Sequence, residues 1–171
     1  MKLAKKIFLI IFITGFTSVM LSSCRVYTFR DVSIPAEVKT IKIEPFINQA
    51  RYVNPQLTSR LGEAFQLKVV RQTRLTRTNN DDAHYQVGGY ISQYDVTTAG
   101  ISGQQTATNR LTVSVHLTFR NTLTNKSEEY DVSRNFDFPA NLSLPQAEAQ
   151  LLDDIIRNMS DEIFNRIFSN W

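Results

Sequence analysis

Alternating apolar and polar residues predict a series of β-strands through the middle of the chain. In the clearest pattern, over 111–120, apolar residues stand at the odd positions and polar residues at the even positions: Leu111, Val113, Val115, Leu117 and Phe119 against Thr112, Ser114, His116, Thr118 and Arg120. A period of two puts successive side chains on opposite faces of a sheet. The segment therefore predicts a strand with one buried and one solvated face.

Less regular patterns of the same kind predict further strands over 38–46, 75–78, 85–97 and 130–138. The last of these patterns is interrupted at Arg134. Gly88-Gly89 indicates a bulge or a close approach of two backbones. Residues 100–108 carry no charge and are interpreted as a long hairpin loop, and 121–126 link the next two strands.

Apolar residues at helical spacing predict one helix before these strands and one after them. Asn54-Pro55 suits a helix start, with Asn as the N-cap and Pro in the first turn, and the pattern continues to about Gln72. Ser143 and Gln146 have the spacing of a capping box ahead of the second helix. Its apolar stripe consists of Leu151, Leu152, Ile155, Ile156, Met159, Ile163 and Ile167.

This order of elements predicts an α+β fold. Two helices packed on one face of a mostly antiparallel four- to five-stranded sheet form a two-layer sandwich that buries the apolar faces of both layers. We expect a single domain of this kind over residues 37–171.

The first 23 residues predict a signal peptide. Three lysines among the first six residues precede an apolar run over 7–16 and a stretch of small residues over 17–23. The apolar run is shorter than the roughly 18 residues that a membrane-spanning helix needs. The signal peptide ends in Leu21-Ser22-Ser23-Cys24, which resembles a bacterial lipobox.

The lipobox resemblance makes Cys24 the expected lipidation site, where a thioether carries diacylglycerol. The alternative is an ordinary signal peptide followed by a free cysteine. Cys24 is the only cysteine, which excludes an intramolecular disulfide. Residues 24–36 are then a lipidated tether, and Arg25, in the place of an inner-membrane Asp signal, favours the outer membrane.

Charge excludes one class of function. The chain has 19 basic and 16 acidic residues, and removal of the three signal-peptide lysines leaves 16 of each. A neutral mature protein offers no overall electrostatic attraction to nucleic acid. Locally, five basic residues gather over 60–77, and this cluster is either a solvated helix face or a contact surface for a phosphorylated lipid or acidic partner. They are Arg60, Lys68, Arg71, Arg74 and Arg77.

The sequence shows no constellation for catalysis. The two histidines, His84 and His116, lack a third metal ligand at any recognisable spacing. The adjacent carboxylates at 81–82, 128–129 and 153–154 point to different sides of a strand or helix, so they do not form acid/base pairs. We therefore expect neither enzymatic activity, nor a metal, nor a cofactor.

An ordered set of segments resembles the LPS-assembly lipoprotein family LptE. The segments are Cys24, Tyr27-x-Phe29, Ile34-Pro35, the strand 38–43 followed by Pro45-Phe46, Asn54-Pro55 and Asn109-Arg110-Leu111-Thr112. The resemblance implies a two-layer protein that plugs the β-barrel LptD in the Gram-negative outer membrane. Together the two proteins form the translocon that delivers lipopolysaccharide to the outer leaflet. The domain would face the periplasm and the barrel lumen.

The resemblance also bears on lipopolysaccharide binding. Family members that bind lipopolysaccharide carry basic residues at the hairpin and before the last helix, where this chain reads Ile101-Ser102-Gly103 and Leu142-Ser143-Leu144. This departure favours the plug and barrel-assembly role over direct binding. If lipid A phosphates are contacted, the candidates are Arg71, Arg74, Arg77 and Arg110. The alternative function is a stand-alone periplasmic lipoprotein that binds a glycan or lipid in a concave apolar pocket.

Overall fold

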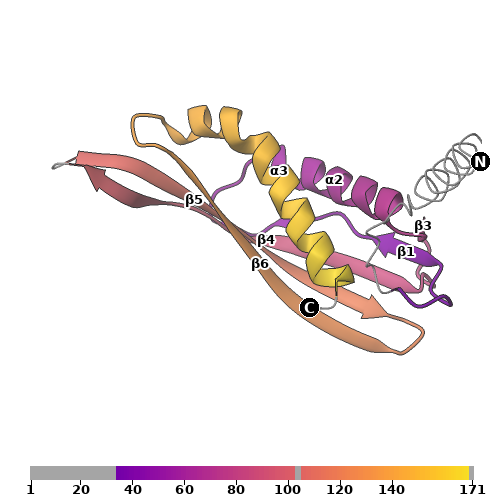
Figure 1. Cartoon of the computed structure of the whole chain (residues 1–171). Coiled ribbons are helices and arrows are strands. Elements are labelled where there is room, and N and C mark those ends of the chain that lie inside the picture. Colours follow the sequence, from indigo (N-terminus) through magenta and orange to yellow (C-terminus); the bar gives the residue numbers. More distant parts are fainter. Residues whose placement is uncertain (1–33, 103–104, 170–171) are drawn as a thin grey trace, which may run out of the picture. The chain divides into compact units, whose positions relative to one another are not determined.

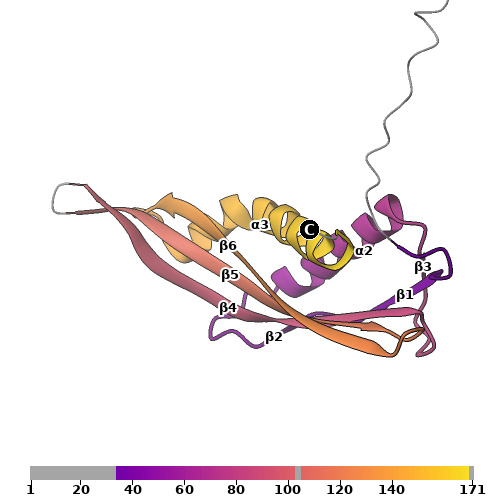
Figure 2. The same ribbon diagram turned by 60° about the horizontal axis from the view of Figure 1, so that its bottom comes forward.

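The computed structural model describes residues 34–102 and 105–169, which form six strands and two helices. The predicted signal peptide, the predicted lipidation site Cys24 and the predicted tether as far as residue 33 lie outside the described residues. Along the chain these elements are β1 (Thr40–Ile43), β2 (Ile47–Asn48), α2 (Leu57–Gln72), β3 (Thr76–Arg77), β4 (Tyr85–Ser102), β5 (Gln105–Asn121), β6 (Lys126–Pro139) and α3 (Leu144–Phe168). All but β2 are labelled in Figure 1, and β2 is labelled in Figure 2.

Three long antiparallel strands make up most of the sheet. β4 pairs with β5 from Tyr85 opposite Asn121 onward, and β5 pairs with β6 as far as Thr108 opposite Pro139. β1 and β2 add to the other side of β4 in parallel, and β3 pairs in parallel with β1. The order β3-β1-β4-β5-β6 leaves β6 as an edge strand with one neighbour among the described residues.

Both helices lie on the same face of this sheet, as Figures 1 and 2 show. The apolar positions of β5 point toward them, and its four central ones are fully buried. Each fully buried aliphatic or aromatic side chain contributes about 1.5–3 kcal/mol relative to exposure, so this interface holds the two layers together. The two-layer α+β prediction is confirmed. The helical part of the core includes Leu57, Leu61, Phe65, Val69, Ile155, Met159 and Ile163.

The start of α2 differs from the prediction. The helix begins at Leu57, and Gln56 rather than Asn54 is its N-cap residue. The Oδ1 atom of Asn54 accepts a hydrogen bond from the backbone N–H of Gln56 at 3.0 Å, and its Nδ2 donates to Glu148 of α3 at 2.9 Å. Asn54 therefore lies in a turn ahead of the helix, and its side-chain amide links this turn to α3.

Gly89 marks a close approach of two backbones. A Cβ atom at this position would lie 2.4 Å from the backbone oxygen of His116, so no side chain fits without a shift. The bulge lies further along, where the register with β5 shifts between Ile91 and Gln93. One extra residue there lets both Ile91 and Tyr94 point into the core although they are three positions apart.

Two strand predictions were wrong. Residues 100–108 are mostly strand rather than loop, because β4 continues to Ser102 and β5 resumes at Gln105. β6 runs without interruption through Arg134, whose side chain reaches across the edge of the sheet to Glu162 of α3.

Candidate functional site

The sheet face opposite the helices carries short polar side chains, and in the described part of the chain no helix covers it (Figure 2). Facing side chains on β5 and β6 bond to one another across the strands, which satisfies polar groups that lie partly out of water. The pairs are Arg110 with Asp137, Thr112 with Asn135, and Ser114 with Ser133, at 2.7–2.9 Å. We call this surface the open face.

Arg110 makes the strongest contact on the open face. Its Nε and Nη2 atoms donate to the two carboxylate oxygens of Asp137 at 2.7 and 2.9 Å, a bidentate arrangement. The hydrogen bond from Arg110 holds the pKa of Asp137 below its usual value, and the pKa of Arg110 is raised in turn. The two charges therefore neutralise each other on the face.

Further along the open face, His116 sits among two carboxylates and a tyrosine. Its Nδ1 lies 2.9 Å from Asp131 Oδ1, and its Nε2 lies 3.7 Å from Glu129 Oε2. The ring of Tyr90 stands 5.0 Å from the imidazole, centre to centre. A hollow of about 300 Å³ adjoins this cluster at Gly88, with Glu129 on its wall.

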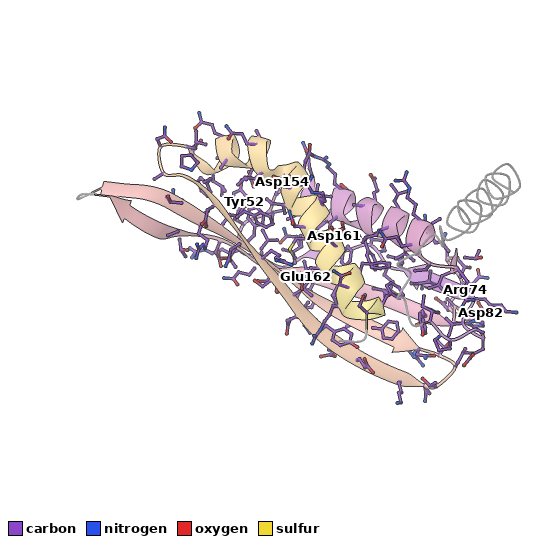
Figure 3. The ribbon with its side chains drawn as sticks, viewed as in Figure 1. Tyr52, Arg74, Asp82, Asp154, Asp161 and Glu162 are labelled. Atoms are coloured by element: carbon purple, nitrogen blue, oxygen red, sulfur yellow. The ribbon has the colours of Figure 1, made fainter. Side chains whose placement is uncertain are left out.

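On the helix side, a groove of about 470 Å³ separates α2 from α3. Two ion pairs bridge it, Arg60 with Asp153 and Lys68 with Asp161, each at 2.6 Å. Its lining alternates charged groups with apolar ones such as Leu67. Figure 3 shows Asp154, Asp161 and Glu162 following one another along α3.

The structure brings three of the four candidate arginines together. Arg71 lies in the last turn of α2, Arg74 just after it and Arg77 in β3, and all three are exposed. The Nη2 atom of Arg74 donates to the backbone oxygen of Ile34 at 3.2 Å. Arg110 stands apart from them, on the open face. In Figure 3, Arg74 lies at the same end of the domain as Asp82.

A buried carboxylate that the sequence analysis missed ties three segments together. Glu148 accepts hydrogen bonds from Tyr52 Oη at 3.1 Å, Asn54 Nδ2 at 2.9 Å and Tyr94 Oη at 2.7 Å. Its exposed fraction is 8%. The signal was present in the sequence, because Glu148 lies one turn before Leu152 on the apolar stripe of the last helix.

The described residues hold no group of three or more side chains that could ligate a metal. The Nδ1 atom of His84 accepts a hydrogen bond from the backbone N–H of Lys39 at 3.0 Å, which gives this histidine a structural partner. Within 34–102 and 105–169, no helix has the length and apolar character needed to cross a membrane.

Together these features define a class: a two-layer α+β domain whose sheet exposes a self-paired polar face. A family model described as "LptE: Lipopolysaccharide-assembly" matches residues 38–167. The chain belongs to the LptE family, a family of non-enzymatic assembly lipoproteins, and membership supports a role in lipopolysaccharide assembly. No curated protein sequence matches this chain.

Solved structures similar to this chain are distant from it in sequence. A protein from Xanthomonas campestris of the DUF330 family superposes with a TM-score of 0.50 at 9% identity, covering 78% of this chain and 89% of that one. Rare lipoprotein B from Shewanella oneidensis gives a TM-score of 0.49 at 11% identity, covering 74% of this chain and 92% of that one.

Proposed function

We propose that this protein is a lipoprotein subunit of the outer-membrane lipopolysaccharide translocon. It acts as a plug and assembly factor for an LptD β-barrel and so assists delivery of lipopolysaccharide to the outer leaflet. Acyl chains on Cys24 hold it at the outer membrane, and the domain faces the periplasm and the barrel lumen. The observation that carries the proposal is the open face, found in a member of the LptE family.

The open face has the chemistry that a plug requires. The interior of a large outer-membrane barrel is polar and hydrated. Hydroxyl and amide groups, such as those of Thr112 and Asn135, exchange hydrogen bonds with water or with lumen walls at little cost. Arg110 brings its own counter-ion in Asp137, so insertion buries no unpaired charge there.

Two other features fit the same role. A lipid anchor confines the domain to the membrane that holds the barrel and thereby raises its effective concentration for that partner. The β4–β5 hairpin projects past the helices (Figure 1), which gives the domain an extension that can follow a barrel wall. Arg71, Arg74, Arg77 and Arg110 stay the candidates for contact with lipid A phosphates.

Co-purification tests the proposal directly. The full chain with a C-terminal tag, extracted in mild detergent, should recover a stoichiometric β-barrel of much greater mass, and depletion should stop lipopolysaccharide from reaching the cell surface. Recovery only as a free monomer, with normal surface lipopolysaccharide after depletion, would overturn the proposal and favour a stand-alone ligand-binding lipoprotein.

A further inference from the structure

We infer that the end of the domain formed by the last turns of α2 and by β3 docks on anionic phospholipid headgroups of the bilayer that holds Cys24. The inference rests on the proposed lipid anchor and adds a second membrane contact to it. The surface consists of Leu67, Val70, Arg71, Arg74 and Arg77, and we call it the α2–β3 patch.

The apolar part of the patch lies on the solvent side of α2. Leu67 is 50% exposed and Val70 is 52% exposed, whereas Ser59 and Glu63 occupy the outward positions earlier in the helix. Positions 67 and 70 are three residues apart, so they share one side of α2, and Arg71 lies next to Val70 in the last turn. Isolated exposed aliphatic residues are common. Leu67 and Val70, however, have arginines beside them. Exposed aliphatic residues next to basic residues are typical of a surface that lies in a membrane interface.

The cationic part of the patch has guanidinium groups without a carboxylate partner among the described residues. Within the described residues, Arg71, Arg74 and Arg77 form no ion pair, whereas Arg60 and Lys68 of the same helix each pair with a carboxylate of α3. A guanidinium fork matches two phosphate oxygens. Each basic side chain at an anionic membrane surface strengthens binding about fivefold.

Carboxylates at the same end of the domain oppose this attraction only in part. Asp81 is neutralised by Lys42, whose Nζ lies 2.6 Å away. Glu37, Glu44 and Asp82 are the remaining acidic groups in the segments next to β3, against Lys39 and the three arginines. The net charge of the patch and its surroundings is therefore positive, complementary to phosphatidylglycerol and other anionic lipids.

The place where the tether joins the domain selects the bilayer as the partner. Ile34, the first described residue, is held at the patch by the hydrogen bond from Arg74 to its backbone oxygen. Ten residues lead from Cys24 to Ile34, a reach of at most about 35 Å. β4 alone spans about 60 Å at 3.3 Å per residue. An acyl anchor at Cys24 therefore tethers the patch end of the sheet more closely than the far end.

The experiment compares two labelled positions in the full lipoprotein. Purified protein carrying Val70→Cys or Val53→Cys is labelled with an environment-sensitive thiol fluorophore. It is then reconstituted into phosphatidylethanolamine vesicles with or without phosphatidylglycerol, together with a headgroup-nitroxide lipid as quencher. Val53 is a matched control, because it is a valine of 57% exposure that lies before the N-terminus of α2, whereas the patch lies at the C-terminal end of that helix. The thioether on Cys24 leaves the introduced cysteine as the single reactive thiol.

We expect strong quenching of the fluorophore at position 70 and little quenching at position 53. This difference should increase with the phosphatidylglycerol content of the vesicles and decrease with the salt concentration. Replacement of Arg71, Arg74 and Arg77 by Gln should lower the ratio of docked to undocked protein by about a hundredfold, at about fivefold for each arginine. A second triple variant, Arg60→Gln, Lys68→Gln and Arg157→Gln, changes the net charge equally and should leave quenching unchanged. Circular dichroism checks that both triples fold.

Equal quenching at both positions, or an equal loss in both triple variants, would overturn the docking. Docking seen only after lipopolysaccharide is added to the vesicles would overturn it in favour of a lipopolysaccharide contact. Labelling of the parent protein at Cys24 would instead show that the anchor is missing. Flotation of that soluble protein with anionic vesicles then tests the patch alone, and flotation that does not depend on the three arginines overturns it.

Discussion

At the scale of single residues, the buried carboxylate of Glu148 joins three segments of the domain through hydrogen bonds. Three donors from two other segments converge on it, and no cation lies within ion-pair distance among the described residues. Burial, and next the hydrogen bond to Glu148, raise the pKa of Tyr94 well above its usual value. Tyr52 stacks on Tyr94 at 5.5 Å between ring centres, so the network fixes the segment before α2 against β4 and α3.

Glu148→Leu should lower the free energy of unfolding by about 2–3 kcal/mol, because it leaves the buried hydroxyl of Tyr94 and the amide of Asn54 without their acceptor. Chemical denaturation measures the change. Gln150→Leu, two residues away on the exposed side of α3, should stay within about 0.5 kcal/mol. Equal effects of the two substitutions would show that the network contributes nothing.

Gly89→Ala should destabilise the domain by about 1–3 kcal/mol, because its Cβ meets the backbone oxygen of His116 and neither strand can move freely. Gly88→Ala is the matched control. There the added atom meets side chains, Glu44 Oε2 at 3.0 Å and Thr118 Oγ1 at 3.1 Å, and both can rotate away. Thermal unfolding of the two variants compares them, and a milder effect at Gly89 than at Gly88 contradicts the assignment.

The Arg110–Asp137 pair predicts a pH dependence. The pKa of Asp137 is lowered from 3.8 in the folded chain, so the unfolded chain binds more protons in that range. The stabilisation is present above pH 3.8 and is lost as the pH falls through the lower folded-state value. Asp137→Asn should therefore lower the Tm at about pH 7 and have less effect at about pH 2. The control Asp82→Asn removes an exposed carboxylate outside the pair, and the same pH profile for both would refute the assignment.

At the scale of elements, the sequence predicts a strand or a helix end correctly where residues close together in the chain determine it. β5 is predicted because one of its faces packs on the core, which requires alternating apolar and polar residues. The start of α3 is predicted because the capping box joins residues only three positions apart: Gln146 Oε1 accepts a hydrogen bond from the Ser143 backbone N–H at 2.9 Å. The end of the β4–β5 hairpin was not predicted. At 100–102 and 105–107, β4 and β5 pair only with each other in the described residues, so no third strand or helix-facing core imposes an alternation there.

Hydrogen exchange should separate the two parts of this hairpin. A two-stranded ribbon is marginally stable in water, so backbone amides over 105–108 of the isolated protein should exchange far faster than those of Val113 and Val115. Binding to the proposed barrel should slow exchange in the ribbon. Equally slow exchange in both parts of the free protein would contradict the prediction.

At the scale of the whole molecule, what the sequence could not reveal is which distant residues share a surface. The four arginines named as candidates for contact with lipid A phosphates are divided between the α2–β3 patch and the open face, because β5 carries Arg110 to the other side of the sheet. The Glu148 network likewise joins residues 94 and 96 positions apart, and only the assembled layers bring them together.

Ser114→Phe should reveal whether the open face meets the barrel. Ser114 bonds to Ser133 at 2.9 Å on that face, away from the core, so the substitution should cost the isolated domain about 1 kcal/mol or less. Recovery of the barrel in co-purification should nevertheless fall several-fold, because a bulky ring obstructs a close polar contact. Ser114→Thr serves as the conservative control. Full recovery with Ser114→Phe would place the contact elsewhere.

The edge position of β6 has a consequence for the solubility of the isolated protein. A fourteen-residue strand with one neighbour in the described structure offers its outward amide and carbonyl groups as a template for another chain, the usual beginning of aggregation. Charged side chains punctuate this strand at Glu128, Asp131, Arg134 and Asp137. Charged side chains on an edge strand oppose edge-to-edge pairing of two copies, so these residues favour solubility of the domain.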